Sequence, residues 1–210
     1  DDSLCIDNKA VYIKKVEYLG RIQGGIQNVN PFRKGLKYGF AFQQIEFHKG
    51  HLLHNQNLTG ENIHIAVFDG GFKLVNEMDI FSHIYSENRM IMERDIPNGS
   101  SLQYDYSSHG TAVLSIMGSS KNEYMTGTAP GASYSLFRTE MVNSETRLEL
   151  ENWIKALEIS DSAGVDITNT SLGYTEFDDS TFNFTTSSID GMSNRASIAA
   201  DIATEKGILS

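Results

Sequence analysis

The sequence predicts an α/β protein with three layers, α/β/α, in which helices cover both faces of a mainly parallel sheet. Two observations predict this fold. From Ile63 onward, short apolar segments alternate with amphipathic segments of ten or more residues, an order that favours right-handed crossovers between parallel strands. The 210 residues, 40% of them hydrophobic, suffice for one sizeable core. We therefore expect functional residues at the carboxyl ends of the strands, where sites form in such sheets.

The residues before Ile63 give weaker signals. Residues 10–19 alternate enough to predict a strand, and a passage rich in Gly and Asn follows. We interpret residues 1–37 as a separate N-terminal extension and residues 38–210 as the N-terminal part of one domain. Residues 42–54 fit a single weak helix. The side chains expected to face inward from this helix are Ile45, His48, Leu52 and Leu53.

From Ile63 to the end of the chain, each strand and helix can be assigned in order. The predicted strands cover residues 63–68, 89–94, 132–137 and 165–170. The first predicted helix covers residues 109–118, with Val113, Ile116 and Met117 inward and Gly118 as its end. The second covers residues 146–159, opens with a capping box of Thr146 and Glu149, and has Leu150, Trp153, Ile154 and Leu157 inward. The third covers residues 194–207, with Ile198, Ala199, Ile202 and Ala203 inward.

Charge and hydropathy exclude several kinds of partner. Seventeen basic and 27 acidic residues give a net charge of −10, which disfavours a nucleic-acid ligand. No segment approaches eighteen consecutive apolar residues, and the first residues, DDSLCIDNK, lack the basic and then apolar form of a signal peptide. We expect no nucleic-acid or membrane partner and a monomeric protein.

Two residues combine reactive side chains with a position that such chemistry needs. Asp69 directly follows the predicted strand 63–68 and precedes Gly70 and Gly71, which allow a tight turn and leave room for another segment to approach the carboxylate. His109 opens the predicted helix 109–118. A histidine held by a packed helix can serve a nucleophile through one ring nitrogen and an aspartate through the other. Each pattern alone also fits a strand end or a polar helix start.

Together these stretches resemble the subtilisin-like serine peptidases, the S8 or subtilase family, in the branch common in Bacteroidetes. The matching segments are TGENIHIAVFD, SSHGTAV, TGTAPGASYSLFRT and GVDITNTSLGY, in the family's order, and the resemblance covers about residues 38–210. The resemblance implies a serine endopeptidase with an Asp/His/Ser triad, in which Asp69 orients the base and His109 is the general base and acid. By the same resemblance, residues 1–37 would correspond to the end of a propeptide, and the protein would be secreted or lie on the cell surface.

The same resemblance assigns Ser171, Leu172 and Gly173 to substrate binding. In the family this segment forms a strand edge and a pocket wall, and an extended peptide can add to a sheet edge through main-chain hydrogen bonds. The implied partner is an extended peptide or protein. No cofactor is required, and a structural calcium stays unassigned because residues 119–125 are poor in carboxylates.

The nucleophile of the family lies in a Gly-Thr-Ser-x-Ala or Ser-x-Pro stretch, preceded by an asparagine that donates into the oxyanion hole. Neither stretch occurs in the 210 residues, and residues 127–130 resemble part of it with Ala129 where a hydroxyl is needed. We interpret the chain as truncated and the sheet as incomplete at its C-terminal side. We therefore expect the chain alone to hydrolyse peptide bonds at no useful rate.

Two alternatives remain open from the sequence. One is a catalytically inactive subtilase fragment or pseudoenzyme that acts as a peptide-binding module. The other is a metal site built from His48, His51 and His54, which lacks the Cys or HExxH pattern of zinc sites. We favour the peptidase and assign no metal.

Overall fold

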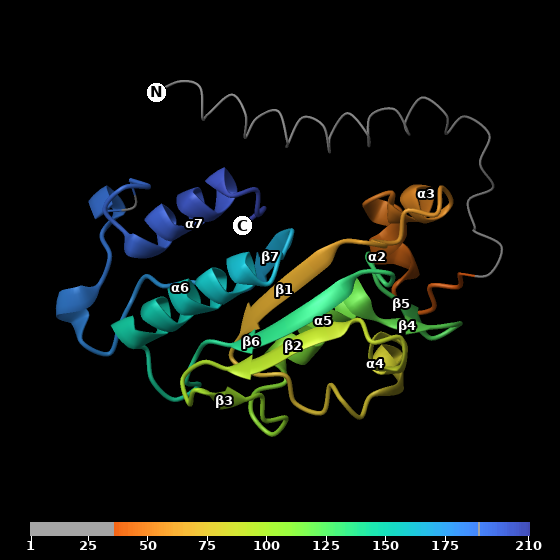
Figure 1. The fold of residues 1–210 in the computed structure, drawn as a ribbon, viewed down its shortest axis with the longest axis horizontal. Coiled ribbons are helices and arrows are strands. Elements are labelled where there is room, and N and C mark those ends of the chain that lie inside the picture. The colour runs from red at the N-terminus through yellow and green to blue at the C-terminus, as the bar shows by residue number, and fades with distance from the viewer. Residues whose placement is uncertain (1–35, 189) are drawn as a thin grey trace.

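A computed structural model describes residues 36–188 and 190–210, which form a sheet between helices (Figure 1). The strand order in the main sheet is β3-β2-β6-β1-β7. All neighbouring pairs are parallel except β2 with β3. The strands are β1 (His64–Asp69), β2 (Met90–Asp95), β3 (Ser100–Ser101), β6 (Ser133–Arg138) and β7 (Ile167–Thr170). The predicted mainly parallel sheet is confirmed. The predicted strand at 10–19 and nearly all of the predicted extension lie outside the described residues.

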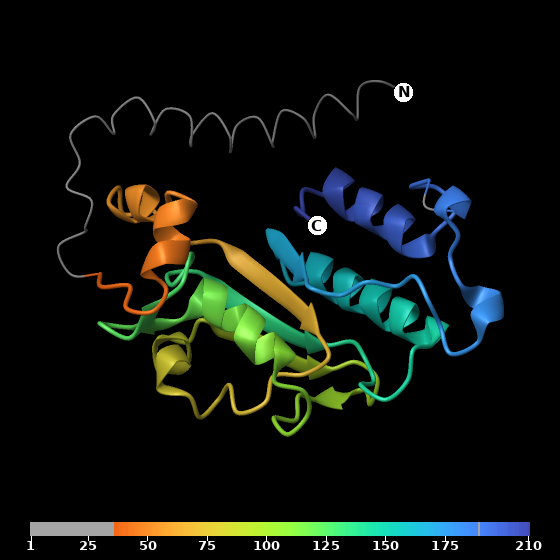
Figure 2. The same ribbon diagram turned by 180° about the vertical axis from the view of Figure 1, so that it is seen from behind.

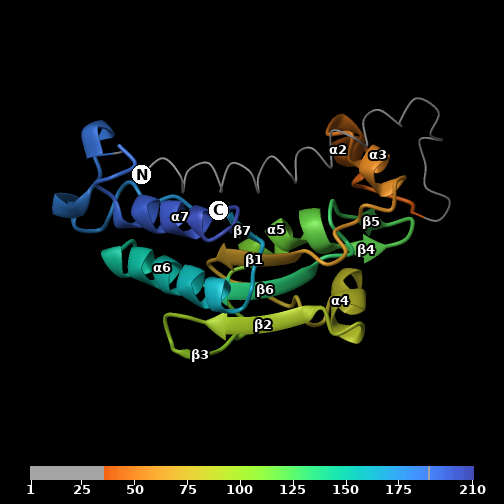
Figure 3. The same ribbon diagram turned by 45° about the horizontal axis from the view of Figure 1, so that its top comes forward.

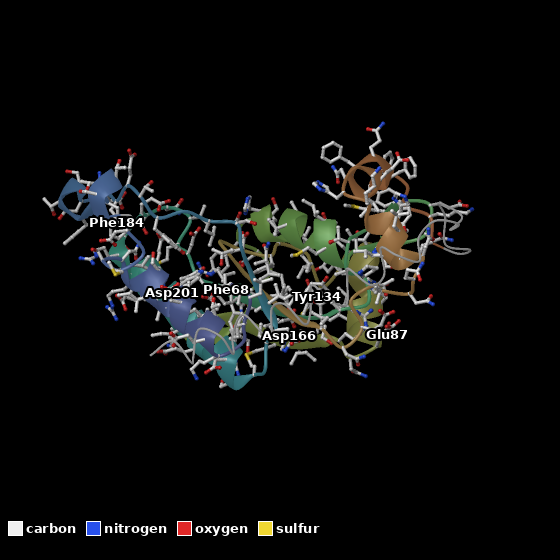
Figure 4. All side chains as sticks on the ribbon, turned by 90° about the horizontal axis from the view of Figure 1, so that it is seen from above. Phe68, Glu87, Tyr134, Asp166, Phe184 and Asp201 are labelled. Carbon is white, nitrogen blue, oxygen red and sulfur yellow. The ribbon has the colours of Figure 1, made fainter. Side chains whose placement is uncertain are left out.

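Strand β1 lies between two parallel neighbours, so its side chains are buried on both faces. Ile65 and Val67 belong to the core on one side of the sheet, and Ala66 and Phe68 to the core on the other. Because successive strand residues point to opposite faces, one apolar run supplies both cores. Figure 4 marks Phe68, and it marks Tyr134, which belongs to the opposite core.

Helices cover both faces, which confirms the predicted three layers. Helix α5 (His109–Gly118) lies on one face, in front of the sheet in Figure 2, with α4 (Ser82–Ser86) contributing to the same core. Helices α6 (Arg147–Ser162) and α7 (Arg195–Glu205) cover the other face and run side by side in Figure 3. Smaller elements are α2 (Phe42–Phe47), α3 (Gly50–His54), the hairpin strands β4 (Ser120–Lys121) and β5 (Met125–Thr126), and the 3-10 turns η2 (Asp79–Phe81), η3 (Ser180–Phe182) and η4 (Thr186–Ser188).

The single helix predicted over 42–54 is wrong. The chain forms α2 and α3, separated at Lys49, whose backbone is left-handed with a φ of 61°. This turn changes the inward face: Ile45 is buried as predicted, whereas His48 is exposed. His54 is buried instead, and its two ring nitrogens lie 2.9 Å from the Tyr38 hydroxyl and 2.9 Å from the Thr128 carbonyl oxygen.

Helix α5 has the predicted bounds, and Val113 and Met117 pack against the core as predicted. Leu114 is fully buried, whereas Ile116 is 53% exposed. The helix approaches the sheet along its smallest residues, Gly110 and Gly118, and an added Cβ at Gly118 would lie 3.0 Å from the Tyr134 ring. The predicted inward position of Ile116 is wrong, because the face that packs on the sheet carries Leu114 together with the two glycines.

Helix α7 matches its predicted face in part, since Ala199 and Ala203 both pack in the core. Ala203 is buried, but Ile198 is 41% exposed and Ile202 is 48% exposed. These two side chains line a groove between α6 and α7. Helix α6, by contrast, buries Leu150, Trp153 and Leu157 as predicted.

Candidate active site

Asp69 and His109, forty positions apart in sequence, meet at the carboxyl end of β1. The Nδ1 atom of His109 lies 2.8 Å from Oδ2 and 3.0 Å from Oδ1 of Asp69. An ionised carboxylate can only accept hydrogen bonds, so this contact places a proton on Nδ1. Asp69 is fully buried, whereas the His109 side chain is 56% exposed. Among the described residues no hydrogen bond reaches Nε2, which leaves it available as an acceptor.

The start of helix α5 fixes the position of His109. The backbone N–H of His109 donates to the Ser107 hydroxyl oxygen (3.1 Å), and the Thr111 hydroxyl donates to the Lys73 carbonyl (2.9 Å). Leu114, one turn further along, is anchored in the core. The imidazole therefore projects from a helix start that is tied both to the preceding loop and to the sheet.

Two glycines allow the close approach of α5 to β1. The N–H of Gly110 donates to the carbonyl of Gly71 at 3.0 Å. A Cβ added at Gly110 would lie 2.6 Å from that carbonyl oxygen and 2.8 Å from the Asp69 Cβ, and one added at Gly71 would lie 2.6 Å from the Ser107 nitrogen. Gly70 differs, because its nearest contact would be Glu140 Oε2 at an ordinary 3.5 Å. The packing therefore requires glycine at 71 and 110.

Burial raises the pKa of the Asp69 carboxyl above its ordinary value. The hydrogen bond and charge of His109 and the backbone N–H groups of Gly70 and Gly71 oppose this rise, because they favour the ionised form. The N–H of Gly70 lies 2.8 Å from Oδ1. Asp69 is thus a buried acid whose charge is supported by donors gathered around it, among them the histidine.

A cleft of about 340 Å³ opens beside the pair. Asp69, Gly70, Ser107 and His109 line one side, and Ser171, Leu172 and Gly173 line another. The structure therefore brings the predicted substrate segment and the predicted dyad to one cavity. Residues 171–173 directly follow β7, and among the described residues their backbone groups make no hydrogen bond. Main-chain donors and acceptors are thus free at the cleft edge.

The remaining wall carries acidic residues that the sequence analysis did not assign. Residues 140–142 and Glu145 complete the lining of the cleft. Glu149, behind this wall, is only 1% exposed, and its Oε1 accepts the backbone N–H of Met141 at 2.8 Å. Thr146 precedes the helix as expected, and its backbone N–H favours the ionised Glu149 carboxyl, but the Thr146 side chain makes no capping bond among the described residues, so the predicted capping box forms only in part. The sequence did contain a signal for this wall: Glu140 follows the predicted strand 132–137 by three residues, at the edge of a parallel sheet where sites form.

No metal centre emerges from the described residues. In the two described stretches, no group of three or more His, Cys, Asp or Glu side chains is arranged to hold a metal. The hydrogen bonds of His54 use both of its ring nitrogens, which disfavours the alternative histidine site. In residues 119–125, Glu123 and Lys121 form ion pairs with Lys37 and Asp79. Calcium binding stays an unassigned prediction.

Comparison with known proteins gives the family. The model of the subtilase family, peptidase S8, matches residues 60–210, which is more than half of the chain, so the chain belongs to the subtilase family. The resemblance drawn from its motifs is confirmed. No curated protein matches the sequence. Across residues 36–188 and 190–210, none of the helices has both the length and the hydropathy needed to span a bilayer.

Solved structures support the same fold. The chain is similar to a serine protease, MycP1, described as an essential component of the type VII (ESX-1) secretion system, with 18% identity and a TM-score of 0.53. Two further MycP1 structures, one from the ESX-1 system and one from Mycobacterium smegmatis, have 17% identity and TM-scores of 0.52 and 0.51. Each comparison covers 84% of this chain, and this chain spans 45 to 46% of those proteins.

The glycine contacts predict which substitutions the site tolerates. Gly110→Ala should lower the free energy of unfolding by about 1–3 kcal/mol because the new methyl group meets the Gly71 carbonyl oxygen, the Phe72 ring and the Asp69 Cβ. This loss should occur although alanine favours a helix over glycine by about 1 kcal/mol. Gly70→Ala is the matched control and should be nearly neutral. Urea unfolding of the three proteins measures the difference, and equal stability of the two variants would contradict the packing described above.

Glu140 predicts a pH dependence of stability. Burial raises its pKa to about 7, and the charges of Glu149, Glu145 and Asp69 act in the same direction, against a hydrogen bond with Tyr174. Because the folded pKa is above the unfolded value, the stabilisation is complete below about pH 4.5 and is lost as the pH rises through about 7. Glu140→Gln, which stays neutral, should therefore gain stability relative to wild type between about pH 5 and pH 8. Urea unfolding at both pH values tests this, and a constant difference would contradict it.

Proposed function

We propose that this chain supplies the acid and the base of a subtilisin-type serine endopeptidase. In this role Asp69 is the orienting carboxylate and His109 is the general base and then the general acid. The observation that carries the proposal is the contact of 2.8 Å between His109 Nδ1 and Asp69 Oδ2, in a histidine that lines the cleft and whose Nε2 has no hydrogen bond among the described residues. Membership of the subtilase family supports the same reaction.

The chemistry follows from the two ring nitrogens. Nε2 would take the proton of the serine hydroxyl as its oxygen forms a bond with the scissile carbonyl carbon. The imidazolium that results is stabilised by the buried Asp69 carboxylate bonded to Nδ1. Nε2 then returns the proton to the leaving amine nitrogen as the carbon–nitrogen bond breaks. Asp69 stays ionised throughout, held by its backbone donors. The serine itself is not assigned among these 210 residues.

The substrate would be an extended peptide lying along Ser171, Leu172 and Gly173. The backbone groups of this segment have no hydrogen bonds among the described residues, so they can pair with a peptide main chain. The segment lines the same cleft as His109. A peptide paired there would present its carbonyl carbons beside Nε2, independently of most of its side chains.

Family resemblance also supports a place of action outside the cytoplasm, as a secreted or surface protein acting as a monomer. We further propose that residues 1–37 are an extension separate from the peptidase domain, which is supported by the start of the family match at residue 60. The alternative of an inactive peptide-binding module shares the cleft but requires no proton transfer. The two functions are distinguished by substitution of Asp69 or His109, which should reduce hydrolysis only if the protein is a peptidase.

Asp69→Asn tests the proposed role of the carboxylate. Asparagine keeps the shape but can favour the wrong tautomer of His109, so kcat should fall about 10⁴-fold while KM changes little. His109→Ala should reduce hydrolysis at least as much. The measurement is hydrolysis of an unstructured protein substrate by the polypeptide translated from the complete reading frame that encodes these residues.

Asp105→Asn, at an exposed aspartate before α5, is the matched control and should hydrolyse the substrate as wild type does. Wild-type activity in Asp69→Asn would contradict the proposed role of Asp69. Absence of any hydrolysis by the wild-type polypeptide would favour the inactive binding module.

A further inference from the structure

The charges that line the cleft are unevenly distributed. Asp69, Glu140 and Glu145 contribute carboxyl groups, His109 is the one basic side chain, and no lysine or arginine lines the cleft among the described residues. Glu140 is close to the dyad, since its Oε2 lies 3.5 Å from the position of a Cβ on Gly70. The wall formed by residues 140–142 and Glu145 is therefore strongly acidic.

A second observation comes from Glu149, which lies behind the wall. It is 99% buried, and among the described residues its Oε2 has no hydrogen-bond donor. Its carboxyl group adjoins that of Glu145, and both act on Glu140. Buried carboxylate oxygens normally have donors, because an unpaired one costs free energy. Glu149 thus adds a further acidic group behind the wall formed by Glu140 and Glu145.

The wall also has an apolar part. Met141 and Val142 line the cleft between the two acids, and both side chains are exposed. Lysine and arginine combine an aliphatic stem with a charged end, so the stem can cover apolar surface while the end reaches a carboxylate. Along the wall, two apolar residues stand between two acidic ones. This order fits a lysine or arginine side chain better than it fits a purely apolar or an acidic side chain.

We propose that Glu140 and Glu145 are specificity-determining residues that select peptides with a lysine or arginine side chain facing this wall. The stem lies on Met141 and Val142, and the charged end lies between the two carboxylates. In an extended peptide alternate side chains share a face, so positions two residues apart can meet the wall while the main chain pairs with residues 171–173. This inference rests on the proposed peptide cleft and names the class of peptide that it takes.

Binding of labelled peptides to the 210-residue chain tests the inference without requiring hydrolysis. The probes are capped, otherwise uncharged octapeptides with lysine, norleucine or glutamate placed at each position in turn, and fluorescence anisotropy gives Kd. Norleucine keeps the stem of lysine and lacks its charge. The effect should appear at one peptide position, or at two positions that are two residues apart. There, the lysine peptide should bind at least about fivefold more tightly than the norleucine peptide, and the glutamate peptide should bind more weakly than both.

The preference for lysine should disappear in Glu140→Gln/Glu145→Gln and persist in Glu158→Gln, a matched change of an exposed glutamate on α6 that lines the other groove. Circular dichroism checks that each variant is folded. As a second measurement on the wild type, the preference should shrink between about 0.05 M and about 1 M salt. A preference unchanged by salt or by the double substitution would overturn the inference.

Other outcomes separate this inference from the proposed function. If lysine and norleucine peptides bind equally, the cleft accepts peptides and only the inference fails. If no peptide binds, both the inference and the proposed peptide cleft fail.

Discussion

The close approach of helix α5 to the end of strand β1 is the constraint on which the site depends. It is set by a backbone contact of 3.0 Å between the N–H of Gly110 and the carbonyl of Gly71. With any side chain at either glycine, backbone atoms would be displaced. That contact brings a histidine on a helix start within hydrogen-bond distance of a carboxylate at a strand end. The parallel sheet supplies the rest, since the segments after β1, β6 and β7 all emerge at the same edge.

The acidic groups at this edge lower the stability of the fold, and they also favour cationic groups in the cleft. Asp69 is fully buried, and burial raises the pKa of its carboxyl group, so holding it ionised opposes stability. Glu140 increases the same negative field. Such destabilising charge is common where pKa values and ligand selection are set by the environment. A cationic imidazole during catalysis, or a cationic substrate side chain, would lower this cost, which links the proposed reaction to the proposed selectivity.

The sequence predicted the fold and the central pair because their signals are local. Residues 65–68 of β1 are consecutive apolar residues, and Asp69 and His109 stand at the boundaries of predicted elements. The remaining wall depends on tertiary contacts: Glu149 bonds the backbone of Met141 across a loop, a contact that the pattern of a helix start does not predict. Hydropathy also placed some exposed side chains in the core. In α5, Gly110 and Gly118 face the sheet together with Leu114, whereas Ile116 faces solvent.

The central claim is that Asp69 holds His109 with a proton on Nδ1 and leaves Nε2 as the acceptor. Long-range ¹H–¹⁵N correlation spectra of the ¹⁵N-labelled 210-residue chain, recorded at a pH where His109 is neutral, measure this tautomer directly. The structure predicts that Nδ1 of His109 has the chemical shift of a protonated nitrogen and Nε2 that of an unprotonated one. A protonated Nε2 with an unprotonated Nδ1 would contradict the account.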